Sequence, residues 1–172
     1  LVFTIAPDKI TSENVALTMR LDQDSIYHPS VSLRFRKDKK QLAAIKNNEG
    51  LSMAPFWDSF HKLDMQFEEL RWKQGDPLVE ISNLQGSAQT KTVFESYNYF
   101  KEIRYKAMLG TDAVHPLSRL RDYNKVAGDV FLAGDFAQFT KLQKPQVIPM
   151  LIDMAVRRYI DYDPETELVH VL

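Results

Sequence analysis

Large apolar residues recur at every second position in several runs of the first ninety-odd residues. They are Val15, Leu17, Met19 and Leu21 in one run and Val31, Leu33 and Phe35 in the next. Such alternation turns one side of a strand to a core and the other to water, as in an antiparallel sheet. A β-rich N-terminal part is therefore predicted for residues 1–96.

Two interruptions and two polar tetrapeptides mark where these strands bend or end. Pro29 lies between the first two runs, where it indicates a bend or an edge position. The alternation changes phase across Glu68-Glu69, which a β-bulge would produce. Residues 74–77, Gln-Gly-Asp-Pro, predict a turn, and residues 37–40 are expected at the solvated tip of a hairpin.

The spacing of apolar residues becomes helical after residue 96. From Tyr97 to Leu109 charged residues separate Phe100, Ile103 and Met108, and Gly110 is a suitable end. We predict a connecting helix within residues 97–111. Its many aromatic and aliphatic residues exceed what a solvated linker tolerates, so we expect it to pack against both halves and couple them.

Residues 112–172 predict a winged-helix-like domain. A first helix opens at Pro116, a short strand follows, and Ala133–Thr140 is expected to form a second helix. The third helix, Lys144–Arg158, has an apolar stripe at helical spacing made by Val147, Ile148, Leu151, Ile152 and Ala155. A hairpin is expected to turn at Pro164-Glu165. The predicted fold class is therefore α+β: an antiparallel β-rich part, a connecting helix and a winged-helix-like part.

The composition excludes several classes of protein and of functional site. The chain of 172 residues is 44% hydrophobic and 26% charged, so a folded globular protein is expected rather than a disordered one. Its formal net charge of −1 favours neither nucleic acid nor an anionic membrane. The absence of cysteine excludes disulfides, thiolate metal sites and a cysteine nucleophile. No apolar run approaches the ~20 residues that span a bilayer.

No motif of catalysis or cofactor binding is found. The sequence lacks a glycine-rich phosphate loop, a nucleophile elbow and a nucleotide fingerprint. The four histidines are scattered and match no metal-ligand spacing. We therefore predict a protein that is not an enzyme and that has no catalytic, cofactor or metal site.

A winged helix suggests DNA binding, but the charges disfavour it. Residues 112–172 hold seven Lys and Arg against nine Asp and Glu, whereas a duplex-binding module needs a basic face. The side of the third helix away from its stripe shows Gln146, Met150, Asp153 and Arg157. A protein contact is favoured for this side. The alternative is a regulator that binds nucleic acid through Lys144, Gln146 and Arg157.

Aromatic residues form a second candidate surface. Trp57 within Phe56–Phe60, together with Trp72, Tyr97 and Tyr99, could form a platform for a partner or for sugar stacking. We favour a structural role, in which these rings fill the sheet core and the seam between the halves. A carbohydrate-binding surface is a weaker alternative.

Five short stretches resemble an internal portion of a family of large uncharacterised proteins of Bacteroidota. They are Tyr27-His28-Pro29, Phe60–Met65, Phe67–Lys73, Phe94-Glu95-Ser96 and the closing Arg158–Tyr162. The resemblance covers most of the chain, and its motifs are structural rather than catalytic. It implies export or a cell-envelope location, although composition also permits the cytoplasm.

Both ends of the sequence lie within strand-like runs, Leu1–Ile5 and Leu168–Leu172. We therefore expect a segment of a larger polypeptide that acts as a non-catalytic structural or protein-interaction part. Its expected partners are other domains of the same polypeptide or another protein.

Overall fold

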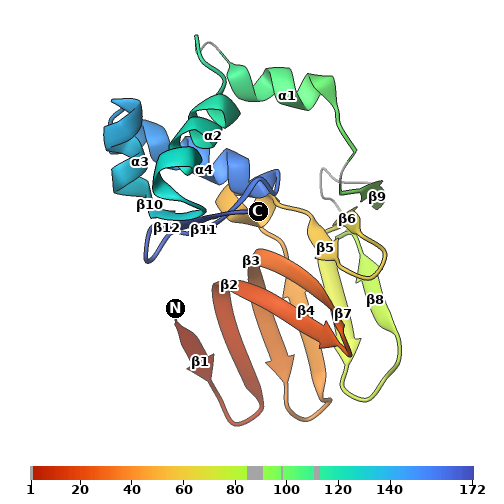
Figure 1. Ribbon diagram of the computed structural model, residues 1–172. Helices are drawn as coiled ribbons and strands as arrows, with labels where there is room; N and C mark the ends of the chain where they lie inside the picture. The colour runs from red at the N-terminus through yellow and green to blue at the C-terminus, as the bar shows by residue number, and fades with distance from the viewer. Residues whose placement is uncertain (1, 85–90, 98, 111–112) are drawn as a thin grey trace. The chain divides into compact units, whose positions relative to one another are not determined.

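The computed structural model describes residues 2–84, 91–97, 99–110 and 113–172 (Figure 1). The chain divides into two compact units, Leu1–Tyr99 (unit 1) and Phe100–Leu172 (unit 2), and each is described by itself. In the residues that the structure describes, they form a mixed α/β protein with a curled antiparallel sheet and four α-helices. Within the described ranges, no helix is both long and apolar enough to cross a membrane.

The described part of unit 1 is a sheet of nine antiparallel strands with one short 3-10 helix, η1 (Gly50–Met53). The strands are β1 (Phe3–Ile5), β2 (Lys9–Leu21), β3 (Asp24–Arg36), β4 (Gln41–Ile45), β5 (Phe56–Asp58), β6 (Leu63–Gln66), β7 (Glu69–Lys73), β8 (Val79–Ser82) and β9 (Val93–Ser96). The order is β8-β7-β4-β3-β5-β6-β9, and β2 pairs with both β1 and β3. The predicted hairpin tip at residues 37–40 and turn at 74–77 are both confirmed.

Strand β3 changes neighbour along its length, and this curls the sheet. Residues 26–27 pair with β5 and residues 32–36 pair with β4. Pro29 lies in the gap between these two pairings, where the register with β2 also shifts. A proline costs least at such an irregularity because its missing N–H breaks no regular ladder. The predicted irregularity at Pro29 is therefore present, but inside one long strand.

The phase change at Glu68-Glu69 is not the β-bulge that the sequence suggested. Strand β6 pairs with β5 and β9, whereas β7 pairs with β4 and β8. Phe67 and Glu68 form the corner between them, and the Glu68 amide donates to the Ser82 carbonyl at 3.2 Å. Residues 67–70 are all buried because the corner has core on both sides. The chain therefore passes between two parts of the curled sheet here.

The core of unit 1 lies inside this curl. Its buried members are Val15, Leu17, Met19, Ile26, Val31, Ala44, Phe56, Met65, Phe67 and Leu70. Phe56 and Phe67 stack with ring centroids 4.4 Å apart. The first predicted apolar run is buried except at its last member, Leu21, which is exposed.

Outside the undescribed residues 111–112, unit 2 contains four α-helices and a three-stranded antiparallel sheet of order β10-β12-β11. Its elements are α1 (Glu102–Leu109), α2 (Pro116–Ala127), β10 (Val130–Leu132), α3 (Ala133–Thr140), α4 (Lys144–Val156), β11 (Ile160–Asp163) and β12 (Leu168–Val171). The helix predicted at Ala133–Thr140 and the hairpin around Pro164 are confirmed. Proline stands in the first turn of both α2 and α4, where its missing N–H costs nothing.

Helix α4 supplies much of the core of unit 2. Val147, Leu151 and Ala155 are buried as predicted, while Ile148 and Ile152 are half-buried. Met154 is fully buried and was missing from the predicted stripe. The helix ends at Val156, two residues before the predicted Arg158, because Arg157 forms the cap. Phe136, Tyr123 and Phe131 pack against one another beside it.

The connecting helix is shorter than predicted. Residues 93–96 belong to β9, and α1 begins only at Glu102 rather than at Tyr97. The Tyr97 amide donates to the Lys62 carbonyl, beside the β6–β9 pairing, and the Tyr99 amide donates to the Ser96 carbonyl. Met108 is the one buried residue of α1, and Ile103 is 84% exposed. The predicted coupling of the two halves stays a prediction.

Candidate interaction surfaces

Helix α4 brings three of the predicted contact residues onto one side. Gln146, Met150 and Arg157 follow one another at spacings of four and seven residues, which align on a helix. Gln146 is exposed, while Met150 and Arg157 are half-buried. Asp153 lies between Met150 and Arg157 on the same side, as predicted from the spacing.

The polar side chains of this helix face already have partners within unit 2. The Arg157 Nε donates to both carboxylate oxygens of Asp153, at 3.0 and 3.1 Å. The Lys144 Nζ lies 2.6 Å from Glu167 Oε1. The Gln146 Oε1 accepts from the backbone amide of Gln143 at 2.9 Å, within a capping box. These bonds neutralise the two cations and fix the amide.

The two tryptophans do not share one platform. Trp57 lies on β5 and Trp72 on β7, and the sheet order places β3 and β4 between these strands. Both are half-buried; Trp72 packs against the core, and its indole donates to the Asp76 carbonyl at 2.9 Å. Among the neighbouring aromatics, Phe56 is fully buried and Phe60 is 68% exposed. The predicted aromatic group is therefore divided between core and surface.

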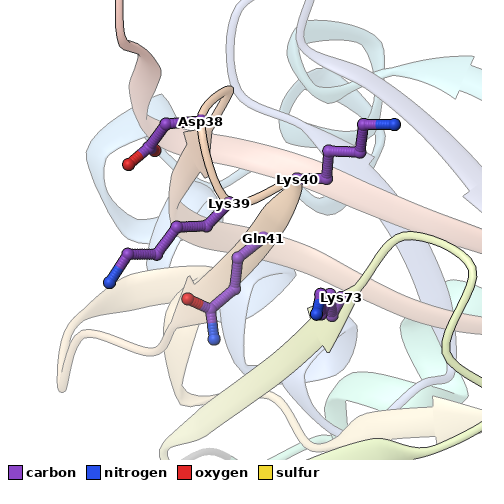
Figure 2. A pocket seen from close by; sticks show the side chains of 5 residues that line it. All are labelled: Asp38, Lys39, Lys40, Gln41 and Lys73. Carbon is purple, nitrogen blue, oxygen red and sulfur yellow. The ribbon is translucent and has the colours of Figure 1, made fainter.

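A hollow of about 370 Å³ lies at the tip of the β3–β4 hairpin (Figure 2). It is lined by Asp38, Lys39, Lys40, Gln41 and Lys73. In Figure 2 the Lys39 and Lys40 side chains leave the hairpin in opposite directions. The sequence indicated the hairpin tip but not the contribution of Lys73. The pairing of Gln41 with Lys73, and the bond from the Gln74 amide to the Lys40 carbonyl at 2.8 Å, bring Lys73 beside the tip.

A buried histidine lies in the part of β3 between its pairings with β5 and β4. His28 is fully buried, and its Nε2 donates to the Ala54 carbonyl at 2.9 Å. Its Nδ1 accepts from the Ser30 amide at 3.1 Å. Burial lowers the pKa of His28 to about 3, and the nearby Lys46 charge acts in the same direction. A neutral ring satisfies both bonds, so His28 is neutral and structural in the folded protein.

Lys46 lies beside the corner formed by Phe67 and Glu68, where its amide donates to the Glu68 carbonyl at 2.8 Å. Its Nζ donates to Gln66 Oε1 at 3.0 Å. Burial lowers the pKa of Lys46 to about 8, partly offset by the negative charge of Glu68. The Glu68 carboxylate also accepts from the Leu84 amide at 2.7 Å. Together these polar side chains satisfy the backbone and one another where the strands change partners.

Across the described ranges, no group of three or more His, Asp or Glu side chains is placed to hold a metal ion. Comparisons of the chain with family models, curated proteins and solved structures find no match.

Proposed function

We propose that the chain is a non-catalytic structural or protein-interaction segment of a larger protein, in which residues 112–172 form a winged-helix-like domain. The order helix, strand, helix, helix and two-stranded hairpin supports this domain assignment. The sheet order β10-β12-β11 also suits it, because the hairpin that would be the wing joins the short strand before α3.

The observation that carries the proposal is the internal pairing on α4. A nucleic-acid-binding helix neutralises phosphates with cations that are available to them. Here Lys144 is held by Glu167 and Arg157 by Asp153, so binding phosphate would first break two ion pairs. Met150 lies between them with a flexible apolar side chain that suits a protein surface. We therefore favour a protein contact over the nucleic-acid alternative.

The carbohydrate-binding alternative has less support. Sugar-binding sites commonly use aromatic rings that present their faces together, and β3 and β4 separate Trp57 from Trp72. The ring of Trp72 is also engaged with its own turn through Asp76. A structural role for both tryptophans remains the better proposal.

Titration of the full chain with a mixed-sequence DNA duplex tests the proposal. At physiological salt we expect binding no tighter than the ~10⁻⁴–10⁻⁶ M typical of non-specific binders. The Asp153→Ala variant releases Arg157 and should bind duplex more tightly than wild type. Asp122→Ala is the matched control, because it removes an equal charge from an ion pair on α2. Nanomolar, steeply salt-dependent binding by the wild type that disappears in Lys144→Ala/Arg157→Ala would support a nucleic-acid regulator instead.

A further inference from the structure

Cationic side chains form two rows across one face of the unit 1 sheet. Directly paired residues in antiparallel strands lie on the same face. The first row is Lys9, Arg36, Gln41 and Lys73, and the second is Thr11, Arg34, Ala43 and Arg71. All five cations in these rows are exposed. Strands β2, β3, β4 and β7 therefore carry a basic outer face in a chain whose net charge is −1.

The opposite face of the same strands belongs to the core. Between the two rows, the register aligns Ile10, Phe35, Leu42 and Trp72. Leu42 and Trp72 pack against the buried cluster of unit 1. The side chains of the two cationic rows therefore point to solvent because successive strand residues alternate between faces.

Strand β4 forms an uncharged strip between the cations. Its outward residues are Gln41 and Ala43, with Arg34 and Arg36 on β3 to one side and Arg71 and Lys73 on β7 to the other. The hollow bounded by Lys39 and Lys40 lies at the hairpin end of this strip (Figure 2). The small side chain of Ala43 leaves room above β4 between its cationic neighbours.

The acidic side chains near this face do not cancel its positive charge. Asp38 is paired with Arg36 at 3.1 Å, and the buried Glu69 is paired with Arg71 at 2.9 Å. Glu80 lies opposite Arg71 on β8, and Asp8 and Asp76 lie in adjoining turns. No ion pair is found among the described residues for Lys9, Arg34, Lys39, Lys40 or Lys73.

We infer that this face binds an acidic polypeptide segment, which lies in an extended conformation along β4. Same-face residues of an extended chain repeat about every 6.8 Å, which is also the spacing of Arg34 from Arg36 and of Arg71 from Lys73. Carboxylates on such a segment can reach both flanking strands, and arginine offers them a planar, bidentate partner.

The same geometry favours a polypeptide over single-stranded nucleic acid. Sequence-tolerant binding of single strands relies on aromatic rings that stack with bases. The aromatic residues beside the two cationic rows, Phe35 and Trp72, belong to the opposite face. Tyr27, the other aromatic residue of these strands, pairs with Trp57 on β5, outside the part of β3 that pairs with β4. The inference rests on the proposed protein-interaction role and gives that role a partner chemistry.

The test is a fluorescence-anisotropy titration of the full chain with a short labelled peptide in which Glu alternates with Ser. A Gln-Ser peptide of equal length is the uncharged probe. We expect the Glu-Ser peptide alone to bind, and its affinity to fall as salt is raised, because exposed charges are screened. Arg34→Glu/Lys73→Glu should weaken binding by about tenfold or more, since it reverses one charge on each side of β4. This variant leaves the ion pair of the exposed Arg71 with the buried Glu69 intact.

The matched control is Arg20→Glu/Lys62→Glu, which reverses two exposed cations of unit 1 outside the two cationic rows, one at the far end of β2 and one just before β6, and should retain wild-type affinity. Absence of Glu-Ser binding, or equal loss in both variants, would overturn the inference. Tighter binding of a single-stranded oligonucleotide of equal charge through the same residues would replace it with a nucleic-acid surface. Self-association that disappears in Arg34→Glu/Lys73→Glu would assign the face to a second copy. Lys144→Ala/Arg157→Ala should leave binding of the Glu-Ser peptide unchanged. The proposal for α4 and the inference for the basic face are therefore tested by different variants, and one can fail without the other.

Discussion

The two units bury polar groups to different extents. Among the described residues, unit 1 buries six polar or charged side chains, whereas unit 2 buries only His115. Those of unit 1 are Ser12, His28, Ser30, Ser52, Glu68 and Glu69. Four of the six lie where β3 changes neighbours or where β6 gives way to β7. A long strand that bends away from its partner leaves backbone groups that need other partners.

Unit 2 needs few buried polar side chains to satisfy its backbone, because its helices and strands are short and end at the surface. Pro116 and Pro145 stand in the first turns of helices, where a backbone donor is unused anyway. Its core can then be apolar, with Leu151, Met154 and Val147 all fully buried on α4. Unit 1 should therefore depend on both its apolar core and its polar corners, and unit 2 mainly on apolar packing.

The largest expected effect is in the core of unit 1. Phe56 is fully buried and stacks on Phe67, so Phe56→Ala should lower the free energy of unfolding by about 3–5 kcal/mol. Urea unfolding followed by tryptophan fluorescence measures this unit, because Trp57 and Trp72 both lie in it. Phe60→Ala is the control, since Phe60 is exposed and its loss should cost about 0.5 kcal/mol or less. Equal losses in the two variants would contradict the assigned core.

In unit 2 the matching change is Leu151→Ala, which should cost about 2–5 kcal/mol by leaving a cavity beneath α4. Far-UV circular dichroism follows this unit, because all four described α-helices belong to it. Val126→Ala on α2 is the control, because Val126 is 77% exposed. An unchanged midpoint for Leu151→Ala would contradict its place in the core.

Tryptophan fluorescence of Leu151→Ala also tests the coupling predicted from the apolar content of residues 97–109. If the two units unfold together, the fluorescence and circular dichroism midpoints should coincide and shift together. A shift confined to circular dichroism would contradict the coupling and show that the units unfold separately.

The elements of unit 2 could be predicted from sequence because their signals are local. Prolines, a change of apolar spacing and a turn tetrapeptide mark each boundary within a few residues. The end of α4 was misplaced by two residues because capping by Arg157 is not visible in the spacing. The face shared by Gln146 and Arg157 was predictable from the helical repeat. The bond from Lys144 to Glu167 was not, since it joins separate elements.

The corners of unit 1 could not be predicted from local patterns. The phase change at Glu68-Glu69 was visible, but a bulge and a change of strand partners produce the same local signal. Contacts with Ser82 and Leu84 define the corner, and these residues lie more than a dozen positions away. The basic face was missed for the same reason, because Arg34 and Arg71 become neighbours of Ala43 only through the sheet register.

The pH dependence of unfolding should differ between the units because of His28. Its pKa is about 3 in the folded protein and near 6.5 when unfolded, so only the unfolded chain takes up a proton between these values. The free energy of unfolding should therefore fall as pH falls below about 6.5, by about 2 kcal/mol at about pH 5. Above pH 6.5 the ring is neutral in both states and contributes no dependence.

His28→Gln isolates this contribution, because the difference from wild type cancels the titration of Lys46, Glu68 and the other groups. The wild-type advantage over the variant should shrink on acidification in the fluorescence transition of unit 1. A difference that stays constant between about pH 8 and pH 5 would mean that the pKa of His28 is the same in the folded and unfolded protein, contrary to the burial of the ring and its two hydrogen bonds.

The smallest expected effect concerns the ion pair on which the proposal for α4 depends. Asp153 and Arg157 are one helical turn apart and joined by two hydrogen bonds, so their coupling energy should be about 0.3–0.5 kcal/mol. A double-mutant cycle of Asp153→Ala and Arg157→Ala, followed by circular dichroism, measures it. Glu102 and Lys106 on α1 are the control pair, with the same spacing but greater exposure, and should couple more weakly. If the α4 pair shows no coupling at low salt, Arg157 is available to phosphate and the preference for a protein partner loses its main support.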